Sequence, residues 1–186
     1  MITEKEKMLN GELYKPFCKD LEKERFLAKK LCMAYNRLMP EQTEEKQQIL
    51  KSLLGNSGNN SIIEPDFFCD YGYNIELDGF VYVNHNCVFL DCAKIKIGSD
   101  TFIGPNCGFY TAIHPINYEQ RISGLESAKP ITIGKGVWFG GGVTVLPGVT
   151  VGDRTVIGAG SVVVKDIPAD VLAVGNPCKV IKQIDN

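Results

Sequence analysis

A six-residue repeat runs through the second half of the chain and limits the folds it can adopt. Apolar side chains recur at every sixth position, and glycine follows most of them. These positions are Ile133, Phe139, Val145, Val151, Ile157 and Val163. A helix needs a period near 3.6 and a plain strand a period of 2, so neither explains the repeat. Short strands joined by tight turns do explain it. The first and third residues of each strand then point inward, and three strands complete one turn of a solenoid.

The repeat also extends backwards, with one displacement. Ile97, Ile103 and Phe109 continue the pattern. Further back, the inward pairs are Ile75/Leu77, Val81/Val83 and Cys87/Phe89, two residues out of the later register. The slip falls between Leu90 and Lys94, which predicts a widened turn that contains Asp91 and Cys92.

Residues 1–54 predict a helical cap. Thr3 and Glu6 fit a capping box for a first helix that ends near residues 10–11. A second helix is expected over residues 19–38 and a third over 43–54. The apolar positions of the second helix are Leu21, Phe26, Leu27, Leu31 and Tyr35. The segment 55–60, G-N-S-G-N-N, reads as a linker to a β domain at 61–186.

The repeat breaks at residues 115–130, directly after His114, which is one of only two histidines. An insertion in a solenoid projects as a surface loop. In the repeat register Ile113 is inward and His114 outward, at the root of that loop. A neutral imidazole there can accept a hydroxyl proton, although a surface histidine bonded to loop backbone is the alternative. Trp138 is likewise expected to face outward, where a subunit interface would cover it.

Composition excludes several classes of protein. The formal net charge of −2 and the pI of about 5.7 give no electrostatic basis for binding nucleic acid. No apolar run is long enough to span a bilayer, and the first residues lack the apolar core of a signal peptide. The seven cysteines show no C-x-x-C spacing, so we expect reduced packing residues in a cytoplasmic protein.

Several segments together resemble the maltose and galactoside O-acetyltransferases, over nearly the whole chain. The matching segments are K-E-K-M-L-N-G-E-L-Y (5–14), C-D-Y-G-Y-N-I (69–75), V-N-H-N-C-V-F-L-D (83–91), I-G-S-D-T-F-I-G-P-N (97–106), Y-T-A-I-H-P (110–115), K-P-I-T-I-G-K-G-V-W-F-G-G (129–141) and I-G-A-G-S-V-V-V-K-D-I-P (157–168). The repeats alone would indicate only a diverse group of β-helix proteins. The cap together with T-A-x-H-P is more specific, and the maltose branch is the nearer match.

The resemblance implies a mainly β fold, a left-handed parallel β-helix with an N-terminal helical cap and one protruding loop. It implies a homotrimer that binds acetyl-coenzyme A between adjacent subunits and transfers acetyl to a sugar hydroxyl, without a metal. An acetyltransferase for another acceptor (serine, an oligosaccharide or an antibiotic) and a non-catalytic trimeric binding module are the alternatives.

The resemblance also implies roles for individual residues. His114 matches the general base. The acceptor-binding positions are Asp70, Tyr82, Asn84 and Asp91. The positions along the coenzyme are Asn84, Trp138, Gly141, Ala159, Val164, Lys165, Lys179 and Lys182. Gly141 matches the residue whose backbone N–H meets the thioester oxygen, within the run of glycines at 140–142. Pro16 and Cys92 stand where the galactoside branch has acceptor-binding aspartates, so the identity of the sugar is open.

Overall fold

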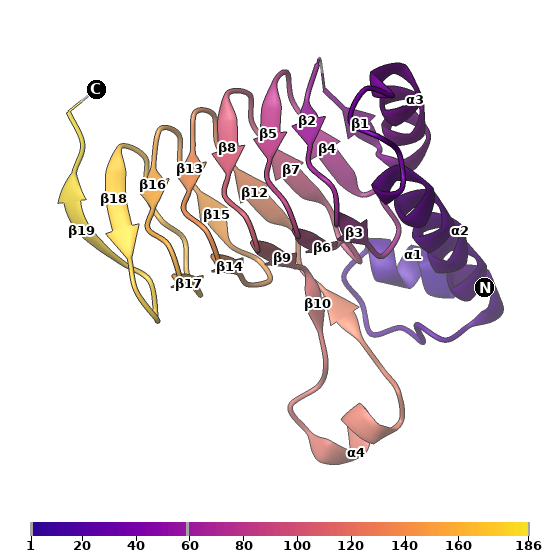
Figure 1. Ribbon diagram of the computed structural model, residues 1–186. Helices are drawn as coiled ribbons and strands as arrows, with labels where there is room; N and C mark the ends of the chain where they lie inside the picture. The colour runs from indigo at the N-terminus through magenta and orange to yellow at the C-terminus, as the bar shows by residue number, and fades with distance from the viewer. Residues whose placement is uncertain (1, 59, 186) are drawn as a thin grey trace.

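The repeated segments form short strands that stack into three parallel sheets (Figure 1). The computed structural model describes residues 2–58 and 60–185; residues 1, 59 and 186, including one position of the predicted linker, lie outside the described residues. The first sheet contains β1 (Asn56–Ser57), β4 (Ile75–Leu77), β7 (Ile95–Ile97), β12 (Ile131–Ile133) and β15 (Thr150–Val151). The second contains β2 (Ile62–Ile63), β5 (Val81–Val83), β8 (Thr101–Ile103), β13 (Trp138–Phe139), β16 (Val156–Ile157), β18 (Val171–Val174) and the antiparallel edge strand β19 (Lys179–Gln183). The third contains β3 (Phe68–Cys69), β6 (Val88–Leu90), β9 (Gly108–Tyr110), β14 (Thr144–Val145) and β17 (Val162–Val163).

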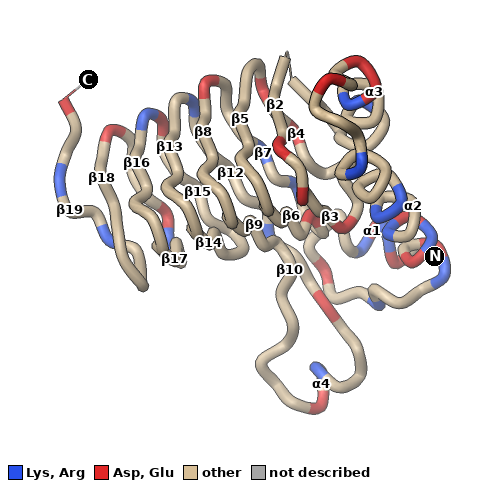
Figure 2. Tube along the Cα trace, in the orientation of Figure 1, with Lys and Arg blue, Asp and Glu red and all other residues tan. Residues whose placement is uncertain are grey.

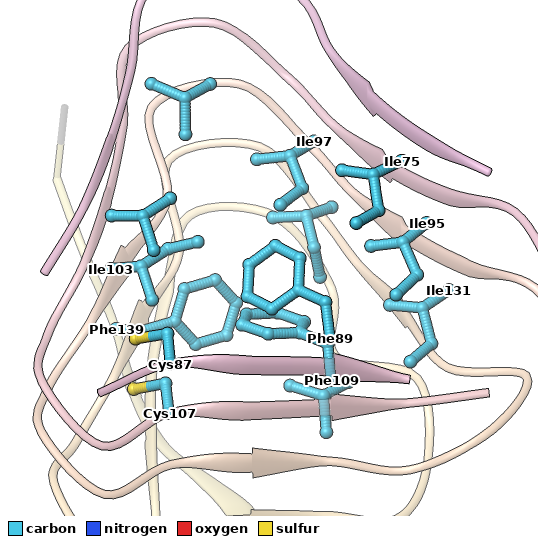
Figure 3. Close-up of a cluster of buried hydrophobic side chains, with 14 of the residues drawn as sticks. Ile75, Cys87, Phe89, Ile95, Ile97, Ile103, Cys107, Phe109, Ile131 and Phe139 are labelled. Atoms are coloured by element: carbon cyan, nitrogen blue, oxygen red, sulfur yellow. The ribbon is translucent and has the colours of Figure 1, made fainter. Parts of the chain in front are cut away.

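The inward positions expected from the repeat form the core. With the exception of Ile113, their side chains are buried from Ile75 to Val163 in both registers. Ile75, Ile95 and Ile131 lie above one another as register partners in the first sheet (Figure 3). In the same interior, the ring centroids of Phe89 and Phe109 lie 4.7 Å apart. The predicted parallel β-helix is thereby confirmed, and a strand already begins at Asn56, inside the predicted linker.

Close stacking of the turns explains the repeated glycine. A Cβ atom on Gly140 would lie 2.6 Å from the backbone nitrogen of Ala159 in the next turn. Real Cβ atoms do not approach so closely, so the corner requires glycine at this position.

Three helices close the N-terminal end of the solenoid (Figure 1). They are α1 (Glu4–Leu9), α2 (Lys19–Asn36) and α3 (Thr43–Leu53). The capping box of Thr3 and Glu6 is confirmed at the start of α1. Buried residues of α2 and α3, such as Tyr35 and Leu50, belong to the same apolar cluster as the solenoid core. The cap therefore covers the open end of that core.

The buried face of α2 differs from the one expected. Phe26 is 73% exposed and Leu27 57% exposed. The buried residues are Leu21, Ala28, Cys32 and Tyr35. Their spacing of seven, four and three residues keeps them on one side of a helix, whereas Phe26 and Leu27 fall on the other.

The protruding loop leaves the solenoid earlier than predicted. Thr111 is fully buried, but Ala112 and Ile113 are only half-buried, so the inward position expected for Ile113 is wrong. The physical reason is that β10 (Ala112–Ile113) pairs antiparallel with β11 (Ser127–Ala128) instead of joining a solenoid sheet. Between these strands lies a short helix, α4 (Tyr118–Ile122), at the tip of the loop (Figure 1).

Charged residues of both signs gather on the cap and at the corners of the solenoid (Figure 2). Within residues 2–58 and 60–185, no helix combines the length and the apolar character needed to cross a membrane.

The stacked phenylalanines predict where truncation is costly. Phe109→Ala removes a fully buried ring and should lower the free energy of unfolding by about 3–5 kcal/mol. The matched change Phe26→Ala, at an exposed position, should stay within about 0.5 kcal/mol. Urea denaturation of both variants measures this difference. Equal losses would contradict the assignment of the core.

Candidate functional site

In three successive turns, one corner of the solenoid is wider than the others. It joins the third sheet to the first and holds residues 70–74, residues 91–94 and the protruding loop in successive turns. We call it the wide corner. Six residues separate the inward positions Phe89 and Ile95 across it, whereas four separate Leu77 and Val81 at another corner. The predicted widened turn with Asp91 and Cys92 is confirmed.

Asp91 is a buried residue whose hydrogen bonds connect two neighbouring turns of the wide corner. Its side chain accepts hydrogen bonds from the backbone N–H groups of Asp70 (3.0 Å), Tyr71 (2.8 Å) and Asn74 (3.3 Å). The amide of Asn74 donates back to the Asp91 carbonyl at 2.7 Å. Because Asp91 is 0% exposed, it offers no surface to an acceptor. Its contacts support the neighbouring turn instead.

Burial also changes the protonation of Asp91. Loss of solvation raises its pKa to about 7, against the lowering by the N–H of Tyr71, and negative Asp70 raises it further. The pKa of Asp70 is raised by burial too, while positive Arg25 and Lys29 on α2 oppose that shift. The wide corner thus contains two carboxyl groups that hold protons more tightly than exposed aspartates do.

His114 lies exposed at the root of the loop, as the repeat predicted. Its side chain is 61% exposed, and its Nε2 atom is 3.8 Å from Oε2 of Glu126. Glu126 itself is 8% exposed. Its other oxygen, Oε1, accepts a short hydrogen bond from the hydroxyl of Tyr14. Neither Glu126 nor Tyr14 is recognisable as a site residue from the sequence, because only the antiparallel pairing at the loop root and the path of the N-terminal segment bring them to His114.

The cap supplies further polar groups to this corner. Arg25 of α2 donates to the hydroxyl of Tyr71 and to the carbonyl of Pro16, both at 2.6 Å. The thiol of Cys92 lies 3.6 Å from Oδ2 of Asp70. Pro16 and Cys92 are the departures from the galactoside branch at acceptor-binding positions. Cys92 lies at the wide corner, and Pro16 is connected to it through Arg25.

A second group of predicted residues lies at the corner between the second and third sheets. Asn84, Gly141 and Ala159 occupy turns of this corner, which we call the glycine corner. The N–H of Gly160 donates to the carbonyl of Gly141 at 2.9 Å, and the Asn84 side chain accepts from the N–H of His85 at 2.8 Å. Among the described residues, the N–H of Gly141 has no acceptor, whereas those of its two glycine neighbours do.

An apolar surface adjoins the glycine corner on the outer face of the second sheet. Tyr82, Phe102 and Trp138 are register partners on β5, β8 and β13. Trp138 is 56% exposed, as predicted for an outward strand position. The hydroxyl of Tyr82 donates to Glu64 at 3.3 Å.

The remaining predicted residues lie toward the C-terminal end. Val164 and Lys165 follow β17 and are exposed, and Lys179 and Lys182 are exposed on β19. In the part of the chain that the structure describes, no group of three or more His, Cys, Asp or Glu residues could hold a metal ion.

One chain does not bring all the predicted site residues together. Asp70, Asp91 and His114 lie at the wide corner, while Asn84, Gly141 and Trp138 lie at or beside the glycine corner. The third sheet separates these two corners. Among the described residues, one chain therefore provides an exposed imidazole beside the Glu126 carboxylate on one edge and a backbone N–H without an acceptor on the other.

Comparisons with known proteins identify similar families independently of the site geometry. The maltose acetyltransferase hexapeptide capping motif matches residues 7–58, and the bacterial transferase hexapeptide model, with six repeats, matches residues 130–165. YJL218W of Saccharomyces cerevisiae, a protein inferred to be an acetyltransferase, is 52% identical over 180 residues, 96% of this chain and 92% of the relative.

Two solved structures are similar along the whole chain. A maltose O-acetyltransferase from Clostridium difficile 630 superposes with a TM-score of 0.95 at 47% identity, covering 99% of this chain and 98% of the other. A galactoside acetyltransferase in complex with coenzyme A superposes with a TM-score of 0.92 at 35% identity, covering 100% of this chain and 92% of the other.

The raised pKa of Asp91 predicts a contribution to stability that depends on pH. Folded Asp91 keeps its proton up to about pH 7, whereas an unfolded aspartate releases it near a pKa of about 3.9. The contribution is therefore fully present below about pH 4 and is lost as pH rises through about 7. Since Asp91→Asn removes this titration, the unfolding free energy of the wild type minus that of the variant should fall by at most about 1.4 kcal/mol per pH unit over that range. Urea denaturation between about pH 4 and 8 measures it, and a constant difference would contradict it.

Proposed function

This chain belongs to the hexapeptide-repeat acetyltransferases that carry the maltose acetyltransferase capping motif, and on that premise we propose that it transfers acetyl from acetyl-coenzyme A to a sugar hydroxyl. The observation that carries the proposal is His114, exposed beside Glu126 at the root of a loop. The names of the similar structures, a maltose O-acetyltransferase and a galactoside acetyltransferase with coenzyme A, support the acceptor class and the donor.

His114 acts as the general base in this proposal. An acetyl thioester is already activated, so the protein need not supply a nucleophile. The acceptor oxygen attacks the thioester carbon while the imidazole takes the hydroxyl proton, and that proton then passes to the departing thiolate of coenzyme A. A base positioned in this way contributes about 10²–10⁴-fold to the rate.

The negative charge that develops on the thioester oxygen needs a donor. The N–H of Gly141, which has no acceptor in the part of the chain that the structure describes, supports that role, because a glycine turn lets a ligand approach the backbone closely. Asn84 at the same corner would contact both acceptor and coenzyme. Ala159, Val164 and Lys165 would line the coenzyme channel, with Lys179 and Lys182 near its phosphates and Trp138 as an aromatic wall.

On the acceptor side we keep Asp70 and Tyr82 as direct contacts. Asp91 receives a different role, because its buried oxygens already accept three backbone hydrogen bonds. It positions Asp70 rather than touching the sugar.

The site is completed by a second copy of the chain in a homotrimer. The separation of His114 from Gly141 across the third sheet supports this arrangement, because neighbouring copies can place one wide corner against one glycine corner. Exposed Phe102 and Trp138 beside the glycine corner are the kind of surface that a subunit contact covers.

The seven free cysteines fit a reducing compartment, so we place the enzyme in the cytoplasm.

His114→Ala tests the reaction. Thiol release from acetyl-coenzyme A in the presence of glucose, maltose or a β-galactoside should fall by about 10²–10⁴-fold with the fold retained. His85→Ala is the matched control, because it removes the other histidine, which lies exposed in a turn. If the wild type releases thiol with none of these sugars, but does so with serine or another hydroxyl compound, the acceptor is that compound and not one of these sugars. Equal activity of His114→Ala and wild type would refute the base.

A complementation experiment tests the shared site. His114→Ala and Gly141→Leu should each be nearly inactive as homotrimers, because the first removes the base from every site and the second covers the backbone N–H of residue 141 with a side chain. Trimers refolded from an equal mixture should regain about a quarter of the wild-type sites, since that fraction combines two intact halves. Light scattering should give three times the chain mass of 20.5 kDa. An active monomer, or no recovery on mixing, would contradict the shared site.

A further inference from the structure

We propose that Glu126 positions His114 and that Tyr14 positions Glu126, so that the N-terminal cap takes part in the chemical step. The inference deepens the proposed function and rests on it. It concerns three residues of one chain. Tyr14 precedes α2, Glu126 directly precedes the returning strand β11, and His114 directly follows the outgoing strand β10.

The strand register aligns these residues in a row. In the loop root Ala112 pairs with Ala128 and Ile113 with Ser127, so the next opposing pair is His114 and Glu126. On the other side, Tyr14 forms an isolated antiparallel bridge with Glu126. The N–H of Tyr14 donates to the Glu126 carbonyl at 2.9 Å, and the N–H of Glu126 donates back at 3.1 Å. Directly opposed residues in such pairs have side chains within contact distance.

The side chains of the three residues are also in a row, with Glu126 between Tyr14 and His114. One carboxylate oxygen of Glu126 accepts from the Tyr14 hydroxyl, and the other lies 3.8 Å from Nε2 of His114. Within the described ranges, no lysine or arginine forms an ion pair with Glu126, so His114 is its cationic partner once protonated. A carboxylate this buried is costly unless it is hydrogen-bonded and paired.

The environment of Tyr14 keeps its hydroxyl available as a donor. Burial raises the pKa of Tyr14 far above its ordinary value, with further contributions from Cys92 and Glu126. Met8, Leu21, Tyr71 and Ala128 pack around it in the smaller apolar cluster of the molecule. The phenol is therefore held in place by the cap and stays protonated.

This arrangement assists proton transfer in two ways. The fixed carboxylate limits the orientations of an otherwise exposed imidazole. When His114 takes the acceptor proton, the neighbouring negative charge stabilises the imidazolium until the proton passes to the thiolate. Glu126 and Tyr14 are thus positioning residues, since neither exchanges a proton with the substrate.

Four variants separate this role from a general structural one. Glu126→Gln should lower kcat by about 10–100-fold, as part of the contribution of the base, while KM for acetyl-coenzyme A stays unchanged. Tyr14→Phe should lower kcat by roughly 3–10-fold, because it removes one hydrogen bond to a charged group. Glu119→Gln and Tyr118→Phe, exposed on α4 of the same loop, are the matched controls and should behave as wild type.

A double-mutant comparison shows whether Glu126 acts through His114. In the His114→Ala background, Glu126→Gln should cause no further loss of residual activity. An equal further loss in that background would overturn the inference and point to a direct contact with the acceptor. So would wild-type kcat in Glu126→Gln, provided that His114→Ala remains inactive. Absence of sugar-dependent activity in the wild type would instead be a failure of the proposed function.

Nuclear magnetic resonance of labelled histidine gives a readout without turnover. In a His85→Ala background the remaining ring signals belong to His114 alone. These signals should shift in Glu126→Gln and in Tyr14→Phe but not in Glu119→Gln. Should Glu126→Gln fail to fold, Tyr14→Phe alone carries the comparison. Unchanged signals in a folded variant would overturn the inference.

Discussion

Every strand of the solenoid lies beside the matching strand of the next turn, and this register is the constraint on which the rest of the structure depends. The interior is built from the inward side chains of these short strands, and those of Ile75, Ile95 and Ile131 stack as direct partners (Figure 3). An added residue cannot be absorbed within such a strand without turning its side chains to the opposite face. Extra chain must therefore leave at a corner, and it does so at the wide corner.

The wide corner joins structural and chemical roles. Buried Asp91 accepts backbone hydrogen bonds that an ordinary turn would make within itself, and this holds Asp70 and Tyr71 in a widened loop. One turn later, the protruding loop begins and ends with two strands that pair antiparallel. This pairing places Glu126 opposite His114. The N-terminal segment completes the corner through Tyr14. The cap region thus both covers the apolar end of the solenoid and contacts Glu126 beside His114.

The solenoid geometry also bears on the proposal that the site is shared between copies of the chain. The third sheet stands between His114 and Gly141. A pocket on such a prism forms most simply where two copies meet, because each then supplies one corner. The exposed aromatic residues on the second sheet lie beside the glycine corner, where such a contact would cover them.

The sequence by itself determined the features that depend on local period. A six-residue repeat that neighbouring residues share accounts for the inward positions other than Ile113, the register slip at residues 90–94, the position of the loop and the exposure of Trp138. His114 is exposed as expected, but it follows an antiparallel strand of the loop root and not a solenoid strand. Only the tertiary structure decided which side of α2 is buried, that Ile113 leaves the core, that Asp91 is covered, and that Glu126 lies between Tyr14 and His114. Those outcomes depend on contacts between distant segments: Tyr14 and Glu126 are 112 residues apart. No periodic pattern relates residues so far apart, because their meeting depends on how the cap and the loop pack against the finished solenoid.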